Sequence, residues 1–260
     1  MSLTLGNGPL SGEPAPANYT IHGPRHRIMV EPTPKRVRIE LAGEIVADTT
    51  RALRLHETGH LPVYYIPADD VRTALMKPTD HRTTCPFKGE ASYFSAVVGD
   101  RTEENVAWTY PEPLDDVAPI AGHIAFYLAQ VDAVYEEAVR LLTHPRDPYH
   151  RVDTLRSDRR VRVRLGDELL AETARPMAVF ETGLTPRWYV PRTDVVTQAL
   201  VRSSTVTLCP YKGVATWWSL DGGPEDIAWA YDEPLPEGLG LQDHLCFTGD
   251  DIEVEVTVDT

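Results

Sequence analysis

Apolar and polar residues alternate along much of the chain with the period of two that is typical of β-strands. The stretches "RVRIELAGEIVADT" (residues 36–49) and "RVRVRLGDELLAET" (160–173) alternate on both sides of a short polar turn, which predicts two hairpins. Short helices are expected after Asp70 and Asp194. Further strands are predicted at "PVYYIP" (62–67), "ASYFSAVVG" (91–99), "PRWYVP" (186–191), "ATWWSL" (215–220) and "DIEVEVTVD" (251–259).

The predicted elements occur twice because the chain contains an internal repeat. At an offset of 124 positions, "TTCPFKGEASYFS" (83–95) matches "TLCPYKGVATWWS" (207–219). The offset then falls to 121, where "AWTYPEPL" (107–114) matches "AWAYDEPL" (228–235). A loop that is three residues shorter in the second copy explains the change from 124 to 121.

This pattern predicts a mainly β protein of two tandem, small, antiparallel domains. The copies span residues 26–128 and 150–260, after an N-terminal tail of residues 1–25. A chain of 260 residues is long enough for each copy to bury its own core. The stretch "LAQVDAVYEEAVRLL" has the apolar spacing of a helix and is followed by prolines, so the linker, residues 129–149, is predicted to be helical.

Composition narrows the range of partners. The formal net charge is −14, which would repel a phosphate backbone, so nucleic acid is not expected as a partner. No apolar run has the roughly 20 residues of a membrane span, and the N-terminus lacks signal-peptide features. The three cysteines, Cys85, Cys209 and Cys246, form no CxxC pair, so neither a disulfide framework nor a metal site is expected. A cytoplasmic location is predicted, without a cofactor, and the oligomeric state is left open.

The two copies resemble a bacterial family catalogued as domain of unknown function 427. The motifs that carry the resemblance are "CPxKG" and "AWxYxEPL", in this order in each copy. The family is similar in fold to the β-tent group, which includes Mss4-like and cereblon-type ligand-binding domains, so the resemblance implies two β-tent-like domains. That group often holds a structural zinc between paired cysteines, which this chain lacks. Some family names mention nucleotidyltransferase, which implies paired metal-binding carboxylates; Asp69-Asp70, Asp115-Asp116 and Asp250-Asp251 form no convincing set.

The repeated turn contains the first candidate functional residues. Only four of the 25 basic residues are lysines, yet both copies have one at the same position of the motif, Lys88 and Lys212. A lysine is a compact charge that can lose its proton when buried, unlike arginine, so the position favours an anion-binding or nucleophilic amine. A structural lysine whose stem packs on the aromatic strand is the alternative.

The cysteine of the turn also has two interpretations. Cys85 and Cys209 precede proline in a turn that could present a thiol at a pocket, where the nearby ammonium would favour the thiolate. Burial as a small apolar residue is the alternative. Only the first copy has Asp80 and His81 upstream, which raises the hypothesis of a Cys85–His81 pair in one active domain.

Aromatic and acidic residues complete the candidate sites. Tyrosine and tryptophan fill the cores of small β-domains, but their polar tips also suit the border of a cavity beside the lysine. Glu57 and Glu181 are candidates for its polar rim, as ion-pair partners of the lysines or as acids or bases. The aromatic candidates are Tyr65, Tyr93, Trp108 and Tyr110 in the first copy and Tyr189, Trp217, Trp229 and Tyr231 in the second.

Three functions remain open from the sequence. The first is binding of a small anionic or carbonyl-bearing metabolite in an aromatic pocket beside the CPxKG turn, with ligand contacts in both copies. The second is an enzyme that uses Cys85 or Lys88 covalently, with Glu57 and His81 as further catalytic candidates. The third is a structural or interaction module, which would show no enclosed cavity and an exposed apolar face.

Overall fold

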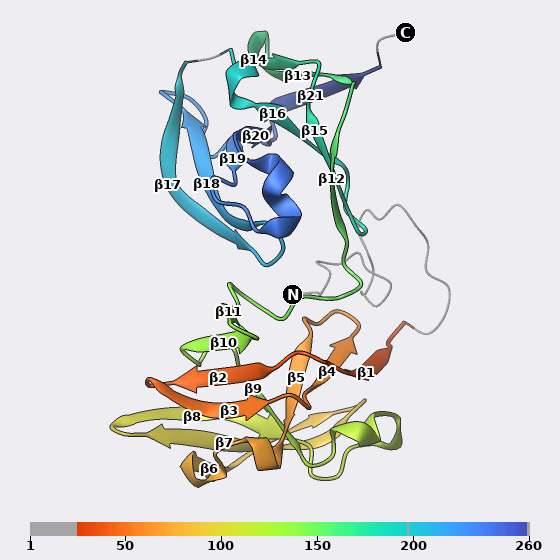
Figure 1. The fold of residues 1–260 in the computed structure, drawn as a ribbon, viewed down its shortest axis with the longest axis vertical. Helices are drawn as coiled ribbons and strands as arrows, with labels where there is room; N and C mark the ends of the chain where they lie inside the picture. Colours follow the sequence, from red (N-terminus) through yellow and green to blue (C-terminus); the bar gives the residue numbers. More distant parts are fainter. Residues whose placement is uncertain (1–24, 197, 259–260) are drawn as a thin grey trace. The chain divides into compact units, whose positions relative to one another are not determined.

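The computed structural model describes residues 25–196 and 198–258, and Figure 1 shows that their regular structure is mainly strand. The chain divides into two compact units, the first ending at Asp147 and the second beginning its main part at Pro148. The predicted fold class is confirmed: the protein is mainly β, and its helices in the described ranges are short 3-10 turns. Among the described residues, no helix is long and apolar enough to cross a membrane.

The first unit is built from two antiparallel sheets. The predicted hairpin of residues 36–49 is present, with β2 (Val37–Leu41) paired to β3 (Glu44–Thr49). Three 3-10 turns connect strands: η1 (Ala68–Asp70), η2 (Thr73–Leu75) and η3 (Asp115–Ile120). The seven-stranded sheet has the order β1 (Ile28–Pro32), β4 (Leu53–Glu57), β5 (Val63–Pro67), β9 (His123–Phe126), β8 (Arg101–Thr109), β7 (Gly89–Val98), β6 (Met76–Cys85). The four-stranded sheet has the order β11 (Val139–Arg140), β10 (Ala133–Glu136), β2 (Val37–Leu41), β3 (Glu44–Thr49).

The second unit repeats this arrangement with a seven-stranded and a three-stranded sheet. The predicted hairpin of residues 160–173 pairs β13 (Arg160–Leu165) with β14 (Glu168–Thr173). Its 3-10 turns are η4 (Arg192–Asp194) and η5 (Pro236–Leu241). The larger sheet has the order β12 (Val152–Arg156), β15 (Met177–Glu181), β16 (Arg187–Pro191), β20 (His244–Phe247), β19 (Ala228–Ala230), β18 (Gly213–Leu220), β17 (Leu200–Cys209). The smaller sheet has the order β14 (Glu168–Thr173), β13 (Arg160–Leu165), β21 (Ile252–Thr257).

The prediction of a helix in the linker, residues 129–149, is wrong. This stretch contributes β10 and β11 to the first unit, and β10 pairs antiparallel with β2. β21 takes the same place beside β13 in the second unit, so the fold needs a closing strand here. The hydrogen bonds and side-chain packing gained by pairing with β2 outweigh the helical spacing of the apolar residues, since tertiary context overrides local propensity.

Each unit has apolar clusters on both faces of its large sheet. In the first unit, Tyr64 packs with the residues between the two sheets, whereas Tyr65 packs on the opposite face with Tyr93, Tyr110 and Ile120. Successive residues of a strand point to opposite faces, so one strand supplies both clusters. We call the cluster on the face away from the smaller sheet the outer cluster. The second unit repeats the division, with Tyr189 in its outer cluster. Cys85 and Cys209 of the CPxKG turns pack against the outer clusters, so these clusters bring aromatic candidates close to the turns.

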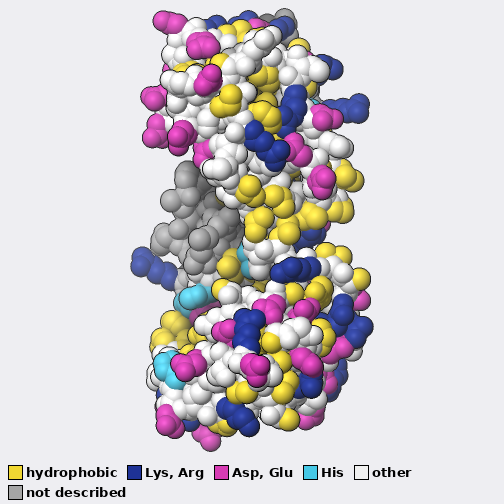
Figure 2. Space-filling model, turned by 90° about the vertical axis from the view of Figure 1, so that its left-hand side faces the viewer, with side chains coloured by type: hydrophobic (Ala, Val, Ile, Leu, Met, Phe, Trp, Pro, Cys, Tyr) yellow, Lys and Arg dark blue, Asp and Glu magenta, His cyan; other side chains and the backbone are white. Residues whose placement is uncertain are grey.

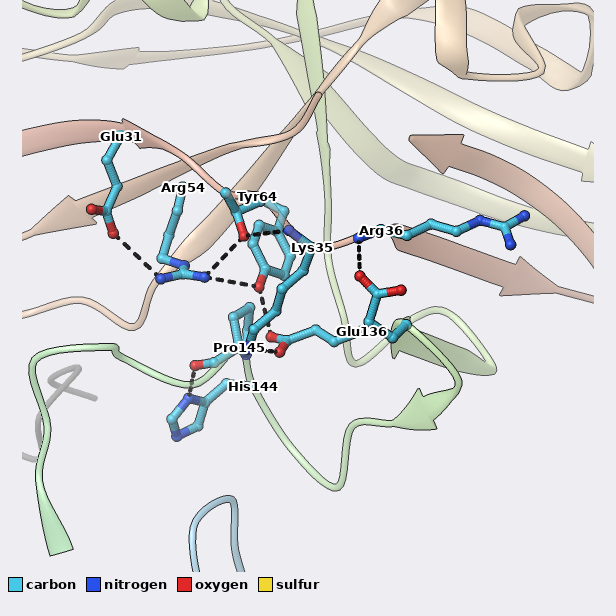
Figure 3. Close-up of polar contacts among 10 residues, drawn as sticks. Glu31, Lys35, Arg36, Arg54, Tyr64, Glu136, His144 and Pro145 are labelled. Carbon is cyan, nitrogen blue, oxygen red and sulfur yellow. Dashed lines mark hydrogen bonds and ion pairs between the residues drawn. The ribbon is translucent and has the colours of Figure 1, made fainter. Parts of the chain in front are cut away.

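The first unit also holds a polar network that the sequence did not predict. Figure 3 shows Arg54 between Glu31 and Tyr64, while Glu136 reaches the Tyr64 hydroxyl from β10. Arg54 donates to Glu31 at 3.3 Å, and Tyr64 donates to Glu136 at 2.6 Å. Lys35 forms an ion pair with Glu136. These contacts satisfy charged groups that would be costly to bury alone.

Charged and apolar side chains are mixed on the surface. Figure 2 shows Lys and Arg interspersed with Asp and Glu on the visible face. The outward side of β17 and β18 in the second unit carries partly exposed apolar residues, Val206, Leu208 and Val214 among them.

Candidate functional site

The CPxKG turn is held in place by the repeated Glu-Pro-Leu segment. The turn joins β6 to β7, and the Leu114 N–H donates to the Lys88 carbonyl at 3.1 Å. Gly89 has φ +103°, and a Cβ at this position would lie 3.1 Å from the Glu112 carbonyl oxygen. In the second unit, Leu235 donates to the Lys212 carbonyl at 2.9 Å. The CPxKG and AWxYxEPL motifs therefore pack on each other, and the glycine is required for both the backbone conformation and the close approach.

The lysine of each turn forms a buried ion pair. Lys88 binds Glu57, which is at the end of β4, and Lys212 binds Glu181, at the end of β15. The lysines are 8% and 6% exposed, so both charges of each pair are largely removed from water. Burying such a pair is costly unless its geometry is good. The pair is nevertheless present at the same position in both units. We call these two pairs the Lys–Glu pairs.

A histidine joins each Lys–Glu pair. His26 Nε2 lies 3.2 Å from Glu57 Oε1, and the ring of His26 stacks on Phe87 at 3.6 Å between centroids. In the second unit, His150 Nε2 lies 3.5 Å from Glu181 Oε2. The ring of His150 stacks on Tyr211, the counterpart of Phe87, at 4.4 Å. The variable aromatic of the CPxKG turn thus holds a histidine against the carboxylate.

The aromatic candidates surround the lysines. The indole N–H of Trp108 donates to the Tyr65 hydroxyl at 3.3 Å, with the two rings edge to face. Trp229 and Tyr189 repeat this contact at 3.0 Å in the second unit. The Lys212 ammonium also lies 6.0 Å from the centre of the Tyr231 ring. Hydrogen bonds between the polar tips fix the orientation of these rings.

The first unit has a pocket of about 920 Å³ at this position. Its wall includes Leu142, Thr143 and His144, which follow β11 and complete one side. Tyr127, partly exposed, lies 4.5 Å from Trp108 between ring centres and also borders the pocket. The sequence-predicted residues that line it are Glu57, Tyr65, Lys88, Tyr93, Trp108 and Tyr110.

The second unit has a smaller pocket of about 270 Å³. Arg187 adds a guanidinium to this pocket, 5.6 Å from the Trp229 ring centre, and Thr207 accepts a hydrogen bond from the Trp217 indole at 2.9 Å. The rings of Trp217 and Trp229 also lie 5.3 Å apart, which narrows the space. The sequence-predicted residues that line it are Glu181, Tyr189, Lys212, Trp217, Trp229 and Tyr231.

The two thiols lie beside residues of these sites without lining the pockets, and His81 does not line them either. In the second unit, the Lys212 N–H donates to Cys209 Sγ at 3.4 Å. Cys85 and Cys209 are half-buried, pack against the outer apolar clusters and are not among the residues that line the pockets. His81 is exposed on β6, four residues before Cys85, a separation of about 13 Å along a strand. The hypothesis of a Cys85–His81 pair is therefore wrong, because both residues belong to one extended strand. His81 instead packs its ring 4.4 Å from that of Tyr93.

Burial determines the ionisation of several groups near the sites. It raises the pKa of the Tyr65 and Tyr110 hydroxyls well above their ordinary values, so both remain protonated donors. Burial also opposes ionisation of Glu181, but the hydrogen bond from His150 and the charge of Lys212 outweigh it and lower the pKa of this carboxyl. The three cysteines are free, and burial raises the pKa of the Cys246 thiol to about 12.

His26 and His150 are functional candidates that sequence reasoning missed. Their signal was present, because His26-Arg27 and His150-Arg151 match at the offset of 124. Both lie at the margin of the repeat, before the first strand, where the match is only two residues long. No group of three or more His, Cys, Asp or Glu side chains in residues 25–196 and 198–258 is arranged to hold a metal ion.

Comparison with known proteins identifies the family. The profile described as domain of unknown function (DUF427) matches residues 29–137 and again residues 153–259. The chain belongs to this family. No curated protein matches the chain. The first DUF427 match extends through β10, in agreement with the place of that strand in the first unit. The resemblance based on CPxKG and AWxYxEPL is thus confirmed. The family description names no activity.

Proposed function

We propose that the first unit binds a small molecule that combines an aromatic or apolar body with a carbonyl or amide group. The observation that carries this proposal is the Lys88–Glu57 pair at the wall of an aromatic pocket of about 920 Å³. This volume lies within the range of small-molecule sites, which are mostly apolar with a few polar groups that fix orientation.

The Lys–Glu pair favours a carbonyl over a free anion. Glu57 already neutralises Lys88, so an anionic ligand would have to compete with a buried carboxylate for the ammonium. A neutral carbonyl can accept a hydrogen bond from an ammonium that keeps its carboxylate partner. An amide can also donate to Glu57, so an amide matches both members of the pair. Trp108 and the partly exposed Tyr127 then supply flat apolar surface for the body of the ligand.

The two other functions have less support. Covalent catalysis by Cys85 would require its sulfur in the pocket, yet Cys85 packs against the apolar cluster and is not a lining residue. Lys88 is held by Glu57 in a buried ion pair, so a substrate would have to displace this carboxylate before it could react with the amine. A purely structural module would not need charged groups at the wall of a cavity of this size.

The test uses the full chain labelled with 5-fluorotryptophan. The chain has five tryptophans, so five fluorine resonances can be assigned by Trp→Phe substitutions. Trp108 is in the first pocket, and Trp217 and Trp229 are in the second. Benzamide serves as the probe because it combines a ring with an amide. We expect a saturable shift of the Trp108 resonance on titration.

The matched variants separate the pocket from general effects. Glu57→Gln/Lys88→Met removes both charges at nearly constant volume and is expected to abolish the saturable shift of Trp108. Lys77→Met removes an exposed lysine of β6 and is expected to leave it unchanged. The proposal is wrong if Trp108 shows no saturable shift in the wild-type protein, or if the double variant binds benzamide as well as Lys77→Met does.

A further inference from the structure

The second unit has another pocket, which is lined by arginines. It lies at the start of β15, beside Met177, whereas Glu181 of the Lys–Glu pair is at the end of that strand. This pocket of about 780 Å³ lies beside η4 and η5, and we call it the arginine pocket. Its basic residues are Arg156 at the end of β12, Arg175 before β15 and Arg192 in η4. Met177 and Leu239 add apolar surface, and Leu239 is 62% exposed.

The repeat shows that two of these arginines are particular to the second unit. At the offset of 124, Arg156 and Arg192 correspond to Pro32 and Ala68, which carry no side-chain donor. At the same offset Thr193 replaces Asp69, so an acidic group of the first unit is lost. Arg175 has a counterpart in Arg51, and both are held by an aspartate of the following 3-10 turn. The differences therefore add two guanidinium groups at one place. The carboxylate lost at position 193 is offset by Asp243, which stands where the first unit has Gly122 at the offset of 121.

The guanidinium groups retain free donors. Arg175 uses Nε and Nη2 to bind Asp194, at 3.3 and 2.8 Å, and Nη2 also donates to the Thr193 hydroxyl at 3.0 Å. Arg192 uses Nη2 to bind Asp232 at 2.7 Å. Each guanidinium has five N–H donors, so both arginines keep donors beyond these contacts. Among the described residues, the Arg156 side chain has no recorded hydrogen-bond or ion-pair partner. Planar guanidinium forks match the oxygens of carboxylates and phosphates.

We propose that the arginine pocket binds a small organic molecule through an oxyanion, a carboxylate or a phosphate, with its apolar part against Met177 and Leu239. Arg156 is the principal anion-binding residue, because it has no competing carboxylate partner among the described residues. Arg192 adds its remaining donors. Asp243 also lines the pocket and repels an anion, so it limits the affinity. This site is separate from the pocket of the first unit and does not depend on the function proposed there.

The experiment uses the full chain with the same fluorotryptophan label. Trp218 reports on the arginine pocket, because the Arg192 guanidinium lies 4.8 Å from the centre of its ring. Phenyl phosphate is the probe, with inorganic phosphate as the comparison that lacks the apolar part. We expect a saturable shift of Trp218 with phenyl phosphate, at a lower concentration than with inorganic phosphate. The Trp108 resonance is expected not to move.

Three variants define the site. Arg156→Gln is expected to weaken phenyl phosphate binding about tenfold, since it removes a charge-assisted contact. Asp243→Asn is expected to strengthen binding about two- to threefold by removing a like charge. The residue at 243 has φ +61°, which asparagine adopts readily, so this variant keeps the backbone. Arg164→Gln removes a half-buried arginine of β13 that donates to the Asp167 carbonyl at 3.1 Å and does not line the arginine pocket; it is the control, with no expected change in binding.

Three results would each overturn the proposal. The first is the absence of a saturable shift of the Trp218 resonance up to about 10 mM phenyl phosphate, because a dissociation constant above this concentration would mean that the pocket has almost no affinity for the probe. The second is equal weakening by Arg156→Gln and Arg164→Gln, which would indicate a general charge effect. The third is a shift of Trp108 that survives Arg156→Gln, which would place the anion at the Lys88 pocket instead. Melting temperatures of all variants are measured to show that each is folded.

Discussion

The two units share the Lys–Glu pair and its supporting turn, but they differ at other positions of the same strands. In the first unit, the polar network of Figure 3 lies where the second has mainly apolar residues. At the offset of 124, Glu31, Arg54, His56 and Tyr64 correspond to Leu155, Ala178, Phe180 and Trp188. The fold therefore accepts either polar or apolar side chains at these positions, whereas the lysine of the CPxKG turn and its glutamate partner are present in both units.

This difference separates requirements of the fold from requirements of the site. A network that one unit replaces by Ala178 and Phe180 is not needed to form the sheet. The Lys–Glu pair, by contrast, is kept in two pockets of different size, about 920 and 270 Å³. The pair is thus the common chemical element, and the pocket around it is the part that changes. The following predictions test this division, from the largest expected effect to the smallest.

Breaking a Lys–Glu pair should have the largest effect on stability. Glu57→Gln leaves the Lys88 ammonium buried without its carboxylate and should lower the free energy of unfolding of the first unit by about 3–5 kcal/mol. Glu181→Gln should act similarly on the second unit. Urea unfolding combined with hydrogen exchange assigns the loss to each unit. The double variant Glu57→Gln/Lys88→Met should recover most of it, and no recovery would contradict the pairing.

Adding a methyl group to the turn glycine should have the next largest effect. Gly89→Ala places a Cβ 3.1 Å from the Glu112 carbonyl oxygen at φ +103°, so we expect a loss of about 2–3 kcal/mol. Gly43→Ala is the control, because its φ is also positive but no atom lies within 4 Å of the added Cβ. It should cost only about 1 kcal/mol. Equal losses in the two variants would show that the close packing on Glu112 is unimportant.

The polar network should contribute less and only in the first unit. Tyr64→Phe removes the hydroxyl that donates to Glu136 at 2.6 Å, and we expect a loss of about 2 kcal/mol. Tyr135→Phe removes a similar hydroxyl that donates to Glu40 at the surface, and its stability should be close to that of the wild type. Thermal unfolding of both variants measures the difference. Identical melting temperatures for the two variants would argue against a stabilising network.

The smallest effect should appear at acid pH in the second unit. The Arg175 guanidinium lowers the pKa of Asp194 to about 2, with help from two threonine hydroxyls and against the effect of burial. The folded pKa is below the unfolded value of 3.8, so this stabilisation is present above that value and is lost as the pH falls toward about 2. Asp194→Asn should flatten the dependence of unfolding free energy on pH in this window. An unchanged slope would mean that other carboxyl groups dominate.

The fold was predictable where alternation and repeats agree. The hairpins β2–β3 and β13–β14 follow from period-two patterns on both sides of a turn. β10 was not predictable, because its apolar spacing also fits a helix and only pairing with β2 decides between them. The polar network was missed for a related reason. Arg54 and Glu136 are far apart in sequence, and local patterns carry no information about such contacts.

The candidate site was predictable from the comparison of the two copies. Lysine at the same position of both turns, with matching glutamates, identified residues that the structure joins as Lys–Glu pairs. The role of the cysteines was not predictable, because a thiol before proline can face either a pocket or a core. His81 shows the limit of sequence proximity, since four residues along a strand separate side chains by about 13 Å.

The most direct test of the central claim compares benzamide with α-methylstyrene, a hydrocarbon of nearly the same shape without a carbonyl or an amide. Saturation of the Trp108 fluorine shift measures the affinity of the wild-type chain for each compound. If the Lys88–Glu57 pair recognises the polar group, benzamide should bind at least about tenfold more tightly, since a site that loses a hydrogen-bonding partner discriminates strongly. The variant Glu57→Gln/Lys88→Met should lose this preference. Equal affinity of the wild-type chain for both compounds would contradict the account.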